Sequence, residues 1–86
     1  MTNLEREIKT HILLALLNAN KAIITDDSLR RAIISGFTHV TFSDTQVGDY
    51  IRSAKSDGLI ASSEDKLWGR VWGLTPEGQN RAMQLL

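Results

Sequence analysis

The sequence predicts an α+β fold that is mostly helical, with a β-hairpin placed between its last two helices. Two observations predict it. Apolar residues recur at helical spacing after typical helix-start residues in three segments, and a proline opens a fourth helix. Two short apolar runs around a polar stretch precede that proline, which is typical of a hairpin. The expected order is helix, short strand, helix, helix, strand, strand, helix, in a single domain over residues 1–86.

The first helix is expected to begin at Thr2, because Thr2 and Glu5 have the spacing of a capping box. It should end near Asn18 or Asn20, since asparagine tolerates the left-handed conformation that often follows a helix. Its predicted buried face consists of Leu4, Ile8, Ile12, Ala15, Leu16 and Ala19. A second apolar strip on the same helix consists of Leu13, Leu14 and Leu17. Another part of the protein must therefore cover this second strip.

A very short strand is expected over residues 22–24, ahead of a second helix that Thr25 or Asp26 caps and Gly36 stops. The residues expected to face inward on this helix are Leu29, Ile33 and Ala32. Residues 37–42 fit either an extended connection or a buried turn.

The third helix is expected over residues 43–57, with Ser43 and Asp44 as its start signal. Asp57 and Gly58 supply the end signal, because glycine adopts the positive φ that other residues resist. The inward face consists of Val47, Ile51 and Ala54.

The hairpin is expected to pair residues 59–61 with residues 67–74 around the polar turn Ser62 to Asp65. Thr75 then caps the last helix, and Pro76 takes its first position, where the missing N–H costs nothing.

The two tryptophans of the hairpin have different expected environments. Trp72 shares a strand face with Leu74 and is expected in the core. Trp68 lies near the tip of the hairpin, where it could stack on a partner or pack across Gly69.

This arrangement resembles the winged-helix domain of MarR-like and PadR-like bacterial regulators. The resemblance is carried by Val47, Ile51, Ala54, the stretch DGLI at 57–60 and the stretch WGLTPEG at 72–78. It implies a three-helix core, a two-stranded hairpin called the wing, and a C-terminal helix. In such domains the third helix enters the DNA major groove while the wing lies along the backbone.

The resemblance implies a small transcriptional regulator or accessory factor whose partner is double-stranded DNA. Helix 43–57 and the wing at 59–74 would supply the DNA-facing positions. These are Ser43, Thr45, Gln46, Gly48, Asp49, Arg52 and Ser53, with Lys55, Lys66 and Arg70 at phosphates. Gln46 is the strongest candidate for base reading, since glutamine can pair bidentately with adenine. Two alternatives stay open: a solvated surface that binds nothing, and an adaptor that binds a protein partner instead of DNA. Size alone suggests a mobile-element origin, and we expect a bacterial or phage source.

The charges argue against strong nonspecific DNA binding. Ten basic and ten acidic residues cancel over the whole chain, and residues 43–72 carry four basic against five acidic residues. Asp49 would face phosphates, while Glu64 and Asp65 would repel the DNA backbone from the wing. Arg30 and Arg31 could supply the missing positive charge. We therefore expect weak nonspecific affinity and a contribution from dimerisation.

A homodimer surface is predicted from apolar residues in excess of what one small core needs. They are Leu13, Leu14, Leu17, Met83, Leu85 and Leu86. A two-fold pair would place two reading helices about 34 Å apart. The alternative is that the last helix folds back over the strip within one chain.

Composition argues against several other classes of protein. The chain has no cysteine, which fits a reducing compartment, and we expect a cytoplasmic protein. His11 and His39 are its only histidines and have no suitably spaced carboxylates, so no metal, cofactor or catalytic residue is expected. The longest apolar run, 12–17, is far shorter than the about 20 residues that span a bilayer, and no signal-peptide pattern is expected.

Overall fold

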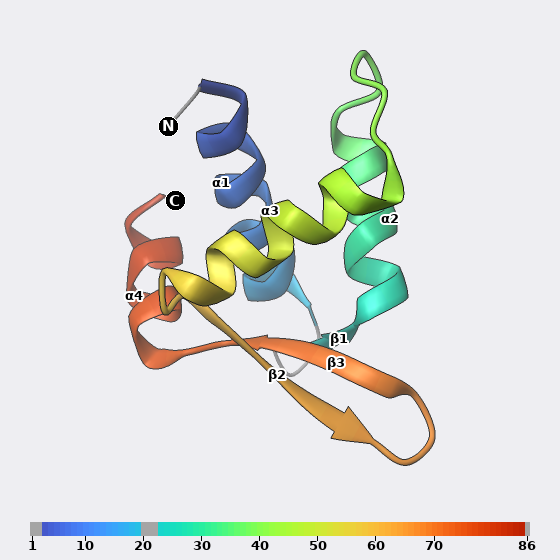
Figure 1. The fold of residues 1–86 in the computed structure, drawn as a ribbon. Coiled ribbons are helices and arrows are strands. Elements are labelled where there is room, and N and C mark those ends of the chain that lie inside the picture. The colour runs from blue at the N-terminus through green and yellow to red at the C-terminus, as the bar shows by residue number, and fades with distance from the viewer. Residues whose placement is uncertain (1–2, 20–22, 86) are drawn as a thin grey trace.

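The computed structural model describes residues 3–19 and 23–85 and confirms the predicted order of elements (Figure 1). The elements are α1 (Asn3–Asn18), β1 (Ile23–Thr25), α2 (Asp26–Gly36), α3 (Asp44–Ser56), β2 (Ile60–Asp65), β3 (Gly69–Leu74) and α4 (Pro76–Gln84). Thr25, Ser43 and Thr75 cap α2, α3 and α4, each by accepting a hydrogen bond from a backbone N–H in the first turn. Thr2, Asn20, Ala22 and Leu86, to which some predictions refer, lie outside the described residues.

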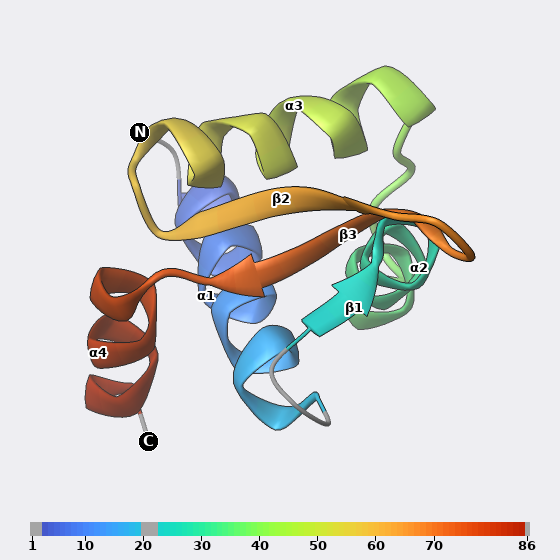
Figure 2. The same cartoon turned by 90° about the horizontal axis from the view of Figure 1, so that it is seen from below.

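The three strands form one antiparallel sheet in the order β1-β3-β2. Ile24 of β1 pairs with Trp72 of β3, which in turn pairs with Ser62 of β2. Seen from below, the sheet lies in front of α1 and α2 (Figure 2). The short first strand therefore ties the base of the wing, formed by β2, β3 and the loop between them, to the start of α2.

The predicted position of the hairpin turn is wrong. Ser62 to Glu64 lie within β2, and the loop is formed by Lys66 to Trp68. Asp65 Oδ1 accepts hydrogen bonds from the backbone N–H groups of the second and third loop residues, at 2.8 and 3.1 Å. Gly69 then closes the loop with a φ of 74°, which glycine adopts without strain. The polar residues resembled a turn, but an edge strand with one solvent face also accommodates them.

The core lies between the helices and the sheet. It comprises Ile8, Ile12, Leu13, Leu16, Leu29, Ile33, Phe37, Val47, Ile51, Ala54, Leu59, Ile60, Trp72 and Ala82. The inward faces predicted for α2 and α3 are thus confirmed, although Ala32 is only half-buried. Trp72 is also in the core as predicted, with an exposed fraction of 3%.

The connection between α2 and α3 begins as a turn whose first residue, Phe37, is buried, while Thr38 and His39 are exposed. Phe37 packs in the core, and its carbonyl accepts a hydrogen bond from the Val40 N–H at 3.0 Å. The rings of His11 and Phe42 stand edge-on to Phe37, at centroid distances of 5.5 and 6.5 Å. His11 Nε2 also lies 2.9 Å from the Ala32 carbonyl oxygen. His11 therefore links α1 to α2.

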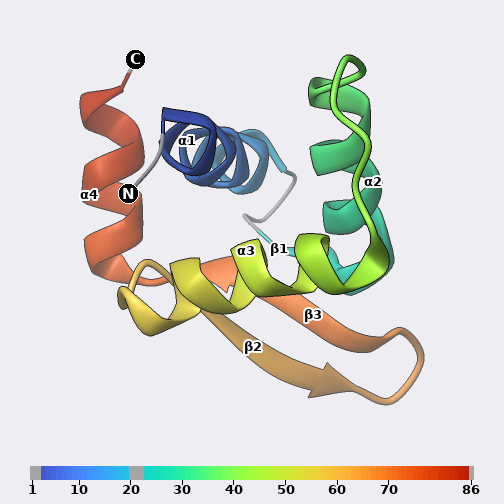
Figure 3. The same ribbon diagram turned by 45° about the horizontal axis from the view of Figure 1, so that its top comes forward.

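The last helix, α4, packs against α1 of the same chain (Figures 1 and 3). Leu13 is buried within the core, while Leu14 and Leu17 are half-buried. On α4, Met83 and Leu85 remain exposed. The last helix thus folds back on the first helix within one chain, as in the alternative to a homodimer, and Leu13 is buried by contacts within its own chain.

Candidate nucleic-acid interface

The third helix presents one side to solvent along the front of the molecule (Figure 1). Val47, Ile51 and Ala54 anchor its other side in the core. The predicted DNA-facing residues Thr45, Gln46, Asp49, Arg52 and Lys55 are exposed together with the N-cap Ser43, and Ser53 is half-buried. Helical spacing therefore brings these predicted site residues to one surface.

The N-terminus of α3 is closed by a capping box, which was not among the predicted start signals of this helix. Ser43 Oγ accepts a hydrogen bond from the Gln46 N–H at 3.1 Å, and Gln46 Oε1 accepts one from the Ser43 N–H at 2.9 Å. The signal was present as serine followed three residues later by glutamine. Since bidentate pairing with adenine uses Oε1 as the acceptor, Gln46 must leave this box before it can read a base in that way.

Gly48 is buried, so its predicted place in a DNA groove is wrong. A Cβ at this position would lie 3.2 Å from Arg30 Nη2 of α2. Arg30 Nη1 also donates to the Asp44 carbonyl oxygen in the first turn of α3, at 3.2 Å. The absence of a side chain at Gly48 lets the guanidinium cross α3 at close range, and Arg30 thereby holds the start of α3 against α2.

Asp26 extends this link from α2 to the wing. Its Oδ2 accepts from Arg30 Nε at 2.9 Å, and its Oδ1 accepts from Trp72 Nε1 at 2.7 Å. Burial opposes ionisation of Asp26, but the hydrogen bonds from Trp72 and Arg30 outweigh it and hold the pKa of the carboxyl below its ordinary value. The carboxylate therefore stays charged at neutral pH and keeps α2, α3 and β3 joined. The i, i+4 spacing of Asp26 and Arg30 could have predicted their pairing, although not the contact with Trp72.

Most of the cations expected at DNA phosphates, or near them, already have a partner. On α3 and the wing, Arg52 pairs with Asp49, and Arg70 lies 3.6 Å from Glu64 across the hairpin. On α2, Arg30 and Arg31 each pair with the aspartate four residues earlier, at 2.9 and 2.8 Å. The suggestion that these two arginines add free positive charge is therefore wrong.

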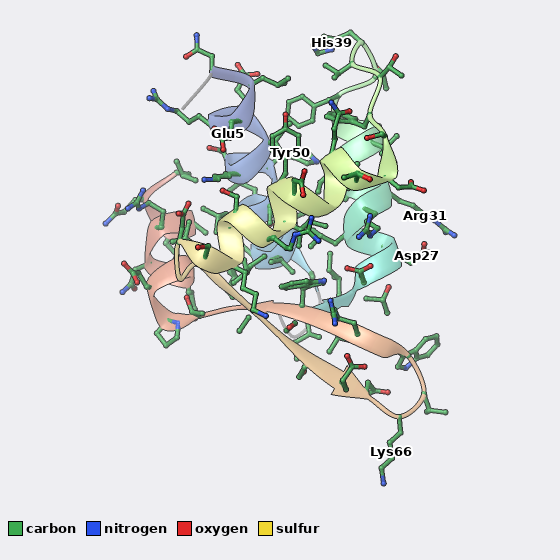
Figure 4. All side chains as sticks on the ribbon, viewed as in Figure 1. Glu5, Asp27, Arg31, His39, Tyr50 and Lys66 are labelled. Atoms are coloured by element: carbon green, nitrogen blue, oxygen red, sulfur yellow. The ribbon has the colours of Figure 1, made fainter. Side chains whose placement is uncertain are left out.

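The two lysines of this surface have other surroundings. Lys55 Nζ lies 6.0 Å from the ring centroid of Trp72, within cation–π range. Lys66 extends from the wing loop away from the molecule (Figure 4), and the structure gives it no ion pair among the described residues. Lys9 of α1 pairs with Asp57 at 2.7 Å, which neutralises one of the five acidic residues counted over 43–72. The surface is thus close to neutral rather than acidic.

Other kinds of site find little support in the described part of the chain. Residues 3–19 and 23–85 contain no group of three or more histidine, aspartate or glutamate side chains placed to hold a metal ion. Within the same residues, no helix has the length and apolar character needed to cross a membrane.

Comparison with known proteins supports the fold. No family model matches the sequence, and no curated protein matches it either. A solved structure that does match is F93 from STIV, described as a winged-helix DNA-binding protein. The two chains are 26% identical, the match covers 92% of this chain and 84% of the other, and the TM-score is 0.66. Four helices, the three-stranded antiparallel sheet and this match together show that the chain has the winged-helix fold.

Proposed function

We propose that this protein binds double-stranded DNA through α3 and the wing. The observation that carries the proposal is the likeness to F93 over nearly the whole chain, since that protein is described as DNA-binding. The geometry adds support, because α3 exposes a side that no other element covers and Arg30 fixes its start. Polar side chains on a rigid, exposed helix suit contact with base edges in the major groove.

The proposal includes a role in transcription regulation and a location in the cytoplasm. The resemblance to MarR-like and PadR-like regulators supports the first, and the absence of cysteine supports the second.

We also propose that two copies associate, with each copy forming one domain over residues 1–86. Met83 and Leu85, which are 57% and 43% exposed, would contribute to that contact. A dimer would help a nearly neutral surface to bind, because each copy adds its own contacts.

Titration of mixed-sequence duplex DNA at several salt concentrations tests the proposal. If Arg52, Lys55, Lys66 and Arg70 all reach phosphates, the logarithm of the affinity should fall with the logarithm of salt at a slope of about −3 to −4 per monomer. If the two ion pairs stay closed and only the lysines reach phosphates, the slope should be about −2. The absence of any complex at low salt would contradict DNA binding and favour the adaptor.

The proposed role of Gln46 in base reading can be separated from its role in the capping box. Gln46→Ala should lose both the base contact and the capping hydrogen bond. We therefore expect relaxed sequence preference together with a loss of about 0.5–1 kcal/mol in the free energy of unfolding. Gln46→Glu keeps an acceptor for the Ser43 N–H but lacks the amide donor that adenine N7 requires. It should therefore keep the stability and lose the preference. Selection from a random-sequence duplex library, beside thermal unfolding, measures both quantities. Unchanged preference in both variants would show that Gln46 serves only as a cap.

A further inference from the structure

The loop of the wing carries two large apolar side chains in solvent. Leu67 is 87% exposed and Trp68 is 70% exposed, the highest values among the large hydrophobic side chains of the described residues. Tight turns are ordinarily made of glycine, proline, asparagine, aspartate or serine. Two adjacent apolar residues at the tip of a hairpin therefore serve no evident purpose in the fold of one chain. We call Leu67 and Trp68 the wing-tip pair.

The wing-tip pair is held on a fixed backbone. Asp65 Oδ1 accepts hydrogen bonds from both of its backbone N–H groups, and Gly69 takes the left-handed conformation that closes the loop. A preformed loop loses little conformational freedom on binding, so the contact area of its side chains contributes more fully to affinity.

The wing tip lies toward the end of the molecule where α3 begins. Figures 1, 2 and 3 all show the loop between β2 and β3 extending to the same side as the first turn of α3. If α3 sits in a major groove, the tip is therefore directed at the flanking DNA. The charges around it are balanced, since Lys66 stands beside Asp65 and Arg70 lies near Glu64. Lys66 is thus the one cation of the loop that can reach a phosphate, while the wing-tip pair itself suits an apolar surface, which in DNA means the bases.

We propose that the wing-tip pair contacts bases rather than the DNA backbone, with Trp68 stacking on a base that is unstacked or unpaired. The proposal rests on the proposed DNA-binding function. Apolar side chains at a hairpin tip can enter between base steps, and stacking of a base on an aromatic ring does not depend on its sequence. Such a contact supplies affinity that is insensitive to salt. It explains how a surface whose arginines are already paired could hold DNA.

The test compares a fully paired mixed-sequence duplex of about three helical turns with the same duplex carrying one unpaired thymine. The wild-type protein should bind the second duplex more tightly, because the unpaired base needs less energy to leave the stack. Trp68→Ala should lose that preference and should bind the unpaired duplex roughly 5- to 100-fold more weakly, with an unchanged salt slope. Trp68→Phe should retain most of the preference, whereas Trp68→Leu should not, since only the ring stacks.

Intrinsic fluorescence gives a second readout. Trp72 is buried, so a change of tryptophan emission on adding DNA reports mainly on Trp68 and should vanish in Trp68→Phe. Ile34→Ala is the matched control, because Ile34 is a 48% exposed apolar residue on α2 outside the proposed surface. It should leave affinity and emission unchanged. Thermal unfolding should show that both alanine variants remain folded.

The outcomes separate this proposal from the function on which it rests. DNA binding that is unaffected by Trp68→Ala, or weakened with a shallower salt slope, would overturn the proposed contact of the wing-tip pair with bases and leave the DNA-binding function standing. Failure of the wild-type protein to bind either duplex would overturn both. Emission that responds to phosphatidylserine vesicles but not to DNA would assign the wing-tip pair to a membrane surface and would also overturn the proposal.

Discussion

Replacing Gly78 with alanine is expected to destabilise the protein by about 3 kcal/mol or more, a large share of the total stability of a small domain. A Cβ at this position would lie 1.8 Å from the Leu59 carbonyl oxygen, far inside contact distance. That oxygen cannot easily move, since it accepts a hydrogen bond from Thr75 N at 3.1 Å, and the Thr75 hydroxyl that lies 3.1 Å from it donates over a shorter distance, 2.6 Å, to the neighbouring Gly58 carbonyl oxygen. The first turn of α4 would have to lift away from the start of β2. Thermal unfolding should show a melting temperature lower by more than about 10 °C.

Two controls separate this close approach from the ordinary effects of alanine. Alanine is the better helix former, so Asn80→Ala on the exposed side of α4 should be neutral or slightly stabilising. Gly69→Ala tests backbone conformation alone, because nothing lies within 4 Å of its Cβ position while its φ is 74°. It should cost about 1 kcal/mol. If Gly78→Ala unfolds at the wild-type temperature, α4 does not approach Leu59 as closely as the structure indicates.

The elements that could be predicted from the sequence are those with local signals. Ser43 and Thr75 precede the third and fourth helices, and each caps its helix as its residue type suggests. The pairing of β1 with β3 had no such signal, because Ile24 and Trp72 meet only in the folded chain. The turn was misplaced for a different reason: the composition of Ser62 to Glu64 fits both a turn and an exposed strand. The close approach that requires Gly78 is likewise a long-range contact, with Leu59, and no local pattern in the sequence signals it.

The exposure predicted for the interface was right for most residues of α3, although Gly48 is buried and Ser53 is half-buried, and the prediction did not identify their partners. Helical periodicity is enough to place Thr45, Asp49 and Arg52 on the solvent side of α3. The pairing of Arg52 with Asp49 follows from their spacing and could have been predicted, as could the capping box. By contrast, the link from Lys9 to Asp57 joins distant segments. Net charge alone therefore could not describe this surface, because it does not reveal which charges neutralise one another.

The ion pair between Asp49 and Arg52 leads to the last prediction, which concerns a gain of affinity. Both side chains are well exposed, at 60% and 68%, so the pair contributes little to stability and can be broken without harm to the fold. Asp49→Asn should remove a carboxylate that repels phosphates and should release Arg52 to bind one. We expect duplex affinity at low salt to rise roughly 10-fold and the salt slope to steepen by about 0.9, the value for one added phosphate contact.

Glu77→Gln provides the matched control, since it makes the same change of net charge on α4, outside the proposed surface. It should raise affinity only slightly and leave the salt slope unchanged, because no arginine is released near the DNA. Equal gains in the two variants would mean that overall charge, not the release of Arg52, governs binding. A loss of affinity in Asp49→Asn would mean that the carboxylate itself contacts DNA, by accepting a hydrogen bond from a base amino group such as that of cytosine. In each case the salt slope distinguishes these explanations, because it reports how many cations reach phosphates independently of the affinity of the complex.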